Sequence, residues 1–173
     1  MFLYVLADEY LALTCTMFHP DGHLLACGGA DGQIKIFDVK TGQLAATFSS
    51  PNNTTAVSSL YFSENGTWLA STSSSSANIS IWDLRKTAEI RVLETGLGHV
   101  DCLNWDYTGQ FLAVGGEGGI SVQQYSKANK EWSEPLKMAL PATGVAWAKE
   151  AKGLVTINAE GVLTFLTTTE SQD

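Results

Sequence analysis

Residues 62–83 read FSENGTWLASTSSSSANISIWD, and this stretch decides the fold. Its first aromatic residue is followed by a polar turn that ends at Gly66, and a short apolar strand then begins at Trp68. A second turn of small residues leads into Ile79-Ser-Ile81, where apolar and polar residues alternate with the period of a half-buried strand. Two such strands joined by small residues predict an antiparallel hairpin.

The same arrangement recurs along the chain at a regular interval. An aromatic-x-x-x-Gly pattern spans Phe18–Gly22 and Trp105–Gly109, and Trp147–Gly153 is a looser copy. The glycines lie at positions 22, 66, 109 and 153, so the steps are 44, 43 and 44 residues. Repeats of roughly 40–45 residues with four strands each are typical of β-propeller blades.

Each repeat supplies the strands of a blade in the same order. Alternating third strands are expected at 34–36, 79–81, 120–122 and 163–165. The remaining expectations are first strands at 13–18, 57–62, 100–105 and 143–147, and outer strands at 43–48, 89–93 and 135–140. No outer strand is expected for the fourth repeat.

We therefore predict an all-β fold, a β-propeller with four blades present. The expected divisions are an outer strand of a preceding blade at 1–10, blades at 11–50, 51–96 and 97–140, and an incomplete last blade at 141–173. These blades are expected to form the C-terminal part of a seven-bladed ring. The alternative is a four-bladed ring in which residues 1–10 complete the last blade.

Two dipeptides at the ends of the predicted third strands carry a resemblance to the WD-repeat family: Trp82-Asp83, and Phe37-Asp38 in altered form. The resemblance implies that the ring locks a strand into its blade. It also implies a hydrogen-bond network between a Gly-His element, matched by Gly98-His99, and a turn aspartate, matched by Asp31. The third and fourth repeats depart from the pattern, because Gln123-Gln124 and Leu166-Thr167 stand where Trp-Asp would be.

A narrower resemblance rests on longer runs, namely Leu13-Thr-Cys-Thr-Met-Phe-His-Pro-Asp-Gly22, Gln33-Ile-Lys-Ile-Phe-Asp38 and Trp82-Asp-Leu-Arg-Lys86. Over residues 11–167 the chain is similar to the C-terminal blades of the pre-mRNA-processing factor 19 family. The resemblance implies nuclear ubiquitin ligases of the spliceosome, linked to DNA repair, whose propeller captures substrates and partners. It implies that ligase activity comes from a U-box and tetramerisation from a coiled coil, and neither motif is found in these 173 residues.

Composition restricts the possible functions further. A formal charge of −8 opposes direct binding to nucleic acid, and no apolar run is long enough to cross a membrane. Three cysteines, Cys15, Cys27 and Cys102, are too few and too far apart for a disulfide framework or a zinc site. We expect no metal and no cofactor.

The catalytic candidate is His99 with Asp101, a pair that could activate a nucleophile in a propeller hydrolase. The structural interpretation, in which His99 joins two blades, is preferred, so no catalytic residue is expected. Candidate partner-binding residues are Trp68 and Phe111, which alternation turns away from the core-facing leucines, and Trp132, in the irregular 127–134 loop. The alternative for Trp68 and Phe111 is packing between adjacent blades.

The sequence thus predicts a non-catalytic scaffold that binds proteins, either spliceosome components or ubiquitination substrates. An unrelated WD-repeat adaptor is the second hypothesis, and a hydrolase that uses His99 is the third.

Overall fold

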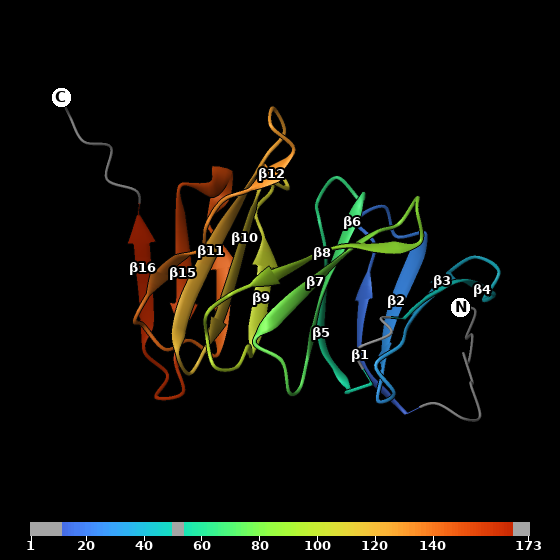
Figure 1. Cartoon of the computed structure of the whole chain (residues 1–173), viewed down its shortest axis with the longest axis horizontal. Coiled ribbons are helices and arrows are strands. Elements are labelled where there is room, and N and C mark those ends of the chain that lie inside the picture. Colours follow the sequence, from blue (N-terminus) through green and yellow to red (C-terminus); the bar gives the residue numbers. More distant parts are fainter. Residues whose placement is uncertain (1–11, 50–53, 168–173) are drawn as a thin grey trace.

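The computed structural model describes residues 12–49 and 54–167, and these residues form four antiparallel sheets (Figure 1). The first sheet contains β1 (Leu13–Phe18), β2 (Leu24–Gly29), β3 (Ile34–Asp38) and β4 (Leu44–Phe48). The second contains β5 (Val57–Phe62), β6 (Trp68–Ser73), β7 (Asn78–Asp83) and β8 (Ala88–Glu94). The third contains β9 (Cys102–Trp105), β10 (Phe111–Gly116), β11 (Gly119–Ser126), β12 (Glu131–Trp132) and β13 (Leu136–Met138). The fourth contains β14 (Gly144–Trp147), β15 (Gly153–Ile157) and β16 (Leu163–Thr167).

Helical structure is nearly absent from the part of the chain that the structure describes. One 3-10 turn, η1 (Lys149–Ala151), precedes β15. No described helix is long and apolar enough to span a bilayer.

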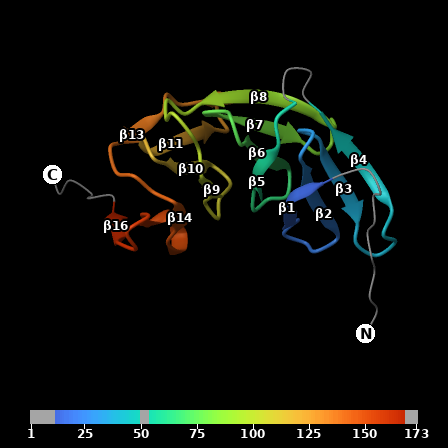
Figure 2. The same ribbon diagram turned by 90° about the horizontal axis from the view of Figure 1, so that it is seen from below.

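The four sheets stand side by side along an open arc, as blades do in a propeller (Figure 2). The first strands β1, β5, β9 and β14 lie on the inner side of the arc, and each contacts the next. The outer strands β4, β8 and β13 lie on the opposite side. We call the sheets blades one to four in chain order. The predicted β-propeller architecture is therefore confirmed.

Strand register shows which residues are equivalent in the four blades. Trp82 on β7 pairs with Leu69 on β6. In the other blades the residue at the Trp82 position pairs with an equivalent leucine, as in the pairs Phe37–Leu25, Gln123–Leu112 and Leu166–Leu154. The four repeats thus share one register although only blade two has the tryptophan.

The hydrophobic core lies between the blades. One buried cluster joins blades one and two, a second joins blades two and three, and a third joins blades three and four. On β7, Ile79 and Ile81 face blade three while Trp82 faces blade one, because successive side chains of a strand point to opposite faces. Both faces of an inner blade are therefore covered by its neighbours.

Within blade three, close approach of two backbone segments requires glycine. A Cβ atom on Gly116, at the end of β10, would lie 2.0 Å from the carbonyl oxygen of His99. Only a residue without a side chain allows the segment before β9 to pass this close to β10. The Gly-rich turn of blade three thus serves packing as well as chain reversal.

Blade three differs from expectation at its outer edge. A single outer strand at 135–140 was predicted, but two short strands, β12 and β13, pair with opposite ends of β11. The prediction that Trp132 lies in an irregular loop is wrong, since it belongs to β12. The first strand begins at Cys102 instead of Val100. The expected strand at 1–10 lies outside the described residues, and the blade divisions at 11, 51, 97 and 141 stay predictions.

We predict that substitutions on the two faces of β8 change the free energy of unfolding by different amounts. Leu93 is 2% exposed and belongs to the core between blades two and three, so Leu93→Ala should lower the free energy of unfolding by about 2–5 kcal/mol. Val92 is 45% exposed, and Val92→Ala should change it by no more than about 0.5 kcal/mol. Urea titration of both variants measures the difference, and equal losses would contradict this placement of the core.

Candidate functional site

The aspartates of the two WD-type dipeptides stabilise the turn between the third and outer strands. Asp38 Oδ1 accepts hydrogen bonds from the amide of Thr41 at 2.7 Å and from its hydroxyl at 2.9 Å. These bonds favour the charged carboxylate and hold the pKa of Asp38 below its usual value. Asp83 Oδ1 accepts from the amides of Arg85 and Lys86 at 2.9 and 3.0 Å. Both residues therefore act locally as turn caps.

The aromatic residues of the dipeptides have different environments. The indole Nε1 of Trp82 donates to Ser71 Oγ at 2.8 Å, and its ring stacks on Phe48 of blade one at 5.5 Å between centroids. Trp82 therefore ties β7 both to β6 and to the preceding blade. Phe37 occupies the same position in blade one but is only half-buried and has no polar atom to donate.

The residues matched to the Gly-His network lie in different blades. Asp31 is exposed in the turn between β2 and β3, and its carboxylate accepts from the amide of Gln33 at 3.0 Å. Gly98 and His99 lie between β8 and β9, where His99 Nε2 is 3.3 Å from Asp101 Oδ1. Each element thus belongs to the network of its own blade, and the networks that the resemblance implies stay a prediction.

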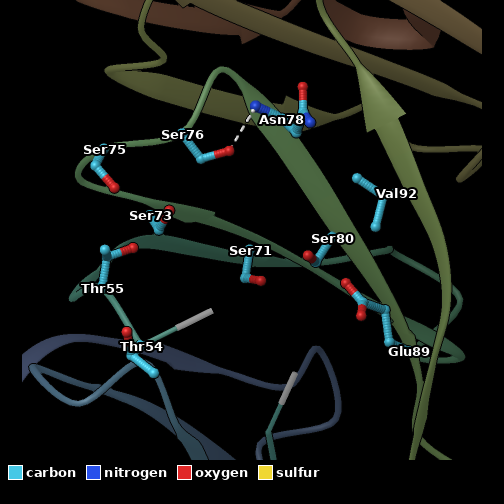
Figure 3. A pocket seen from close by; sticks show the side chains of 10 residues that line it. All are labelled: Thr54, Thr55, Ser71, Ser73, Ser75, Ser76, Asn78, Ser80, Glu89 and Val92. Atoms are coloured by element: carbon cyan, nitrogen blue, oxygen red, sulfur yellow. Dashed lines mark hydrogen bonds between the residues drawn. The ribbon is translucent and has the colours of Figure 1, made fainter. Parts of the chain in front are cut away.

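A pocket lined mainly by hydroxyl groups lies beside the Trp82–Ser71 hydrogen bond (Figure 3). Its volume is about 310 Å³, and it lies on the side of blade two where Ser71, Ser73 and Ser80 gather with the carboxylate of Glu89. No histidine or cysteine lines it, and its one acidic lining residue is Glu89. The pocket can accept hydrogen bonds from, or donate them to, a polar group.

The Trp82–Ser71 hydrogen bond can be tested by removing its acceptor. Ser71→Ala should leave the buried indole N–H unpaired and lower the free energy of unfolding by about 1–3 kcal/mol. Ser75→Ala, in the exposed turn that follows, is the matched control and should leave stability unchanged. Urea unfolding followed by tryptophan fluorescence gives both values. An unchanged midpoint for Ser71→Ala would show that the bond contributes nothing.

Four aromatic rings meet between blades two and three. Trp68 of β6 lies 4.6 Å from Tyr125 and 6.1 Å from both Trp105 and Trp132, measured between ring centroids. Trp132 is also 5.6 Å from Trp105 and 5.5 Å from Tyr125. These distances are typical of favourable aromatic contacts. Trp68 thus packs between adjacent blades, which was the structural alternative for this residue.

The outer side of this cluster forms a groove of about 380 Å³, which we call the aromatic groove. Its walls include Trp68, Tyr125 and Trp132, and the side chains of Arg91 and Lys130 are exposed beside them. A second hollow of about 330 Å³ shares Arg91 and Trp132 and continues along β8.

Trp132 is half-buried in this groove and belongs to β12, not to a loop. Trp105 lies behind it and is 4% exposed, and its indole N–H has no hydrogen-bond partner among the described residues. Sequence reasoning missed Tyr125. The period-two alternation of Ser121, Gln123 and Tyr125 along β11 could have placed it on the face that Gln123 occupies.

Phe111 lies at the equivalent position of the next junction. Its ring is 5.9 Å from Trp147 of blade four, and both rings line an apolar cavity of about 260 Å³ with Leu166. Phe111 therefore also packs between blades. Leu166 stands where blade two has Trp82, so a smaller side chain meets the neighbouring blade here.

The geometry around His99 does not support nucleophilic catalysis. His99 and Asp101 are both partly exposed, and no hydrogen bond joins His99 to a serine, threonine or cysteine within the described ranges. Cys102, the nearest thiol in sequence, is directed to the carbonyl oxygens of Gly115 and Ala142. Among the described residues, no group of three histidine, cysteine or acidic side chains could hold a metal ion.

Burial makes the cysteines poor nucleophiles. It raises the pKa of Cys102 to about 11, with a smaller contribution from the charge of Asp101, while backbone hydrogen bonds with Gly115 and Val145 act in the opposite direction. Burial also raises the pKa of Cys15 and of Cys27. Thiols with raised pKa values stay protonated near neutral pH, whereas reactive cysteines have lowered ones.

We predict that iodoacetamide labels Cys102 of the folded chain only as the pH approaches 11. In urea the same thiol should react near its ordinary pKa of 9.0. Because the unfolded thiol ionises first, the free energy of unfolding should fall as the pH rises from about 9 towards 11. Peptide mass spectrometry after timed labelling measures the reaction, and rapid labelling of the folded chain at pH 8 would contradict the assignment.

Two family models match this chain, and both describe WD domains. The family model of the anaphase-promoting complex subunit 4 WD40 domain matches residues 4–54. The model of the WD domain, G-beta repeat, matches residues 42–83 and 89–122. Together these matches cover the strands of blades one and two and, in blade three, β9, β10 and the first half of β11.

Several curated proteins that are similar to this chain share one name. Pre-mRNA-processing factor 19 of Dictyostelium discoideum is 33% identical over 129 residues, which are 72% of this chain and 24% of that protein. The proteins of the same name from Oryza sativa subsp. japonica and Bos taurus are 34% and 36% identical, over 80% and 89% of this chain and 27% and 30% of theirs. This chain thus spans less than a third of the length of these relatives.

A chain of the mitotic checkpoint complex, whose crystal structure is solved, has a similar fold. It superimposes with a TM-score of 0.74 at 19% identity, over 90% of this chain and 50% of that one. At this identity the match shows the propeller fold alone.

Proposed function

Since the chain belongs to the WD-repeat family, with repeats similar to those of pre-mRNA-processing factor 19, we propose that it is a non-catalytic scaffold that binds other proteins. The observation that carries this proposal is the aromatic groove. It combines tryptophan, tyrosine and arginine side chains, the residue types that dominate the energy of protein interfaces.

The relatives support a proposal for the kind of partner. Proteins named for pre-mRNA processing match 72–89% of this chain in three organisms, so we infer that its partners are spliceosome components or ubiquitination substrates in the nucleus. A ubiquitin-ligase role, with its links to DNA repair, would belong to a longer assembly, because the chain spans less than a third of those relatives. The net charge of −8 favours protein partners over nucleic acid.

The groove also suggests which partner segment binds. Trp68 and Trp132 offer apolar ring surface, and Arg91 and Lys130 place two cations beside it. Glu131 is the carboxylate at the same site. A segment that presents an apolar side chain next to an acidic one would match both features, because the cations guide encounter while the rings supply contact area.

The test compares groove variants with matched surface variants. The double variant Arg91→Glu and Lys130→Glu changes exposed residues, so it should fold normally while it recovers partners from nuclear extract at least tenfold less well than the unchanged chain. This loss corresponds to about 1.4 kcal/mol. The control is Lys40→Glu with Lys149→Glu, which makes the same charge change at exposed residues outside the groove.

The outcomes separate the two parts of the proposal. Equal recovery by groove and control variants would show that partners bind elsewhere on the scaffold. Recovery of proteins without splicing factors or ubiquitination enzymes would contradict the nuclear role and leave an unrelated WD-repeat adaptor.

A further inference from the structure

The aromatic residues that line the aromatic groove carry hydrogen-bond donors without partners. Trp68 and Trp132 each have an indole N–H, which donates and never accepts, and Tyr125 has a hydroxyl. None of these three polar groups makes a hydrogen bond within the described residues, and none is shielded from solvent. The groove therefore offers three donors to a ligand, beside the ring surfaces that flank them.

Two charged donors extend this set. Arg91 of β8 and Lys130, which precedes β12, are exposed at the groove and make no ion pair with a described residue. Guanidinium and ammonium groups donate hydrogen bonds and do not accept them. Among the described residues that line the groove, Glu131 is the only one whose side chain accepts without donating. A ligand that fits must therefore bring acceptors and few donors of its own.

This excess of donors favours a proline-rich segment over an ordinary extended peptide. An ordinary peptide brings a backbone N–H at every residue, and an N–H that is buried without an acceptor is unfavourable. Proline lacks the N–H but keeps its carbonyl oxygen, so a run of prolines brings acceptors alone. The polyproline II helix has no internal hydrogen bonds, and its carbonyl oxygens are free to accept from the groove. Its rings supply the apolar surface that packs on tryptophan and tyrosine.

The extent of the groove fits the same kind of segment. The second hollow, of about 330 Å³, shares Arg91 and Trp132 with the aromatic groove, so Trp132 borders both. A polyproline II helix has three residues per turn and rises about 3.1 Å per residue, so prolines one turn apart lie about 9 Å apart on one side. Two such prolines can occupy one hollow each, with Trp132 between them.

We infer that the aromatic groove binds a proline-rich segment of a partner in the polyproline II conformation, with an acidic residue next to the prolines. This inference rests on the proposed function, because it names the segment that the scaffold recognises. The aromatic side chains pack on the proline rings and donate to the carbonyl oxygens, while Arg91 and Lys130 pair with the acidic residue. Prolines hold the free segment close to its bound conformation, which reduces the entropy lost on binding.

The test titrates the 173-residue chain with two blocked synthetic peptides by isothermal calorimetry. One peptide is a run of prolines followed by two glutamates, and the other has serine in place of every proline. Serine keeps the charge of the peptide but restores its backbone N–H groups, so the serine peptide should bind at least about tenfold more weakly. The indole N–H signals of Trp68 and Trp132 in NMR spectra should shift when the proline peptide is added.

Variants of the groove test the donors and the rings separately. Tyr125→Phe keeps the ring and removes the hydroxyl, so the proline peptide should bind about threefold to tenfold more weakly. Trp132→Leu removes a ring and an N–H together and should weaken binding by more than about tenfold. Tyr107→Phe removes the hydroxyl of an exposed tyrosine in the turn between β9 and β10 and should leave binding unchanged. Circular dichroism and the urea midpoint of each variant show whether its fold is intact.

The outcomes distinguish this inference from the proposed function. Equal binding of the proline and serine peptides would overturn the inference and would leave an acidic segment of any conformation as the ligand. Binding of the proline peptide that Tyr125→Phe and Trp132→Leu both leave unchanged would also overturn it. If the Arg91→Glu and Lys130→Glu double variant loses its nuclear partners while the proline peptide fails to bind the unchanged chain, the scaffold proposal stands and the inference fails.

Discussion

Every blade of this chain depends on its neighbour for the burial of its apolar face. The three buried clusters of the described residues each contain side chains from two blades, and a blade taken alone would expose one or both halves. A single sheet cannot cover its own two faces, so the blades are stable only when contact with a neighbouring blade buries their apolar side chains. The common register, the regular spacing of the turn glycines and the inner position of the first strands all serve to align these faces.

Much of this arrangement follows from the sequence. Alternation places Ile79 and Ile81 on one side of a strand and Trp82 on the other, and the equal spacing of repeats transfers that pattern along the chain. Other features depend on partners distant in sequence. Trp132 follows an irregular segment, and its place is set by pairing with Tyr125 at the far end of β11 and by the rings of Trp68 and Trp105. Asp31 and His99 match different elements of the motif in different blades, so the sequence alone does not say which residues each of them contacts.

One position on the third strand of each blade shows how the chemistry of the junctions varies. Where blade two has Trp82 stacked on Phe48, the junction is closed by rings. Gln123 takes the same position in blade three, is 7% exposed, and donates from Nε2 to the carbonyl oxygen of Glu94 at 3.4 Å. Leu166 takes it in blade four, beside an apolar cavity. One repeated framework thus places a different side chain at the same position of each junction.

The dependence of each blade on its neighbour can be measured by hydrogen exchange of the native chain at increasing urea concentrations, read strand by strand. If blades two and three share one core, β5–β7 and β9–β11 should open together with one free energy, because losing either blade exposes the other. Opening of each sheet at its own, unrelated free energy would contradict the account and would show that the blades are independent units.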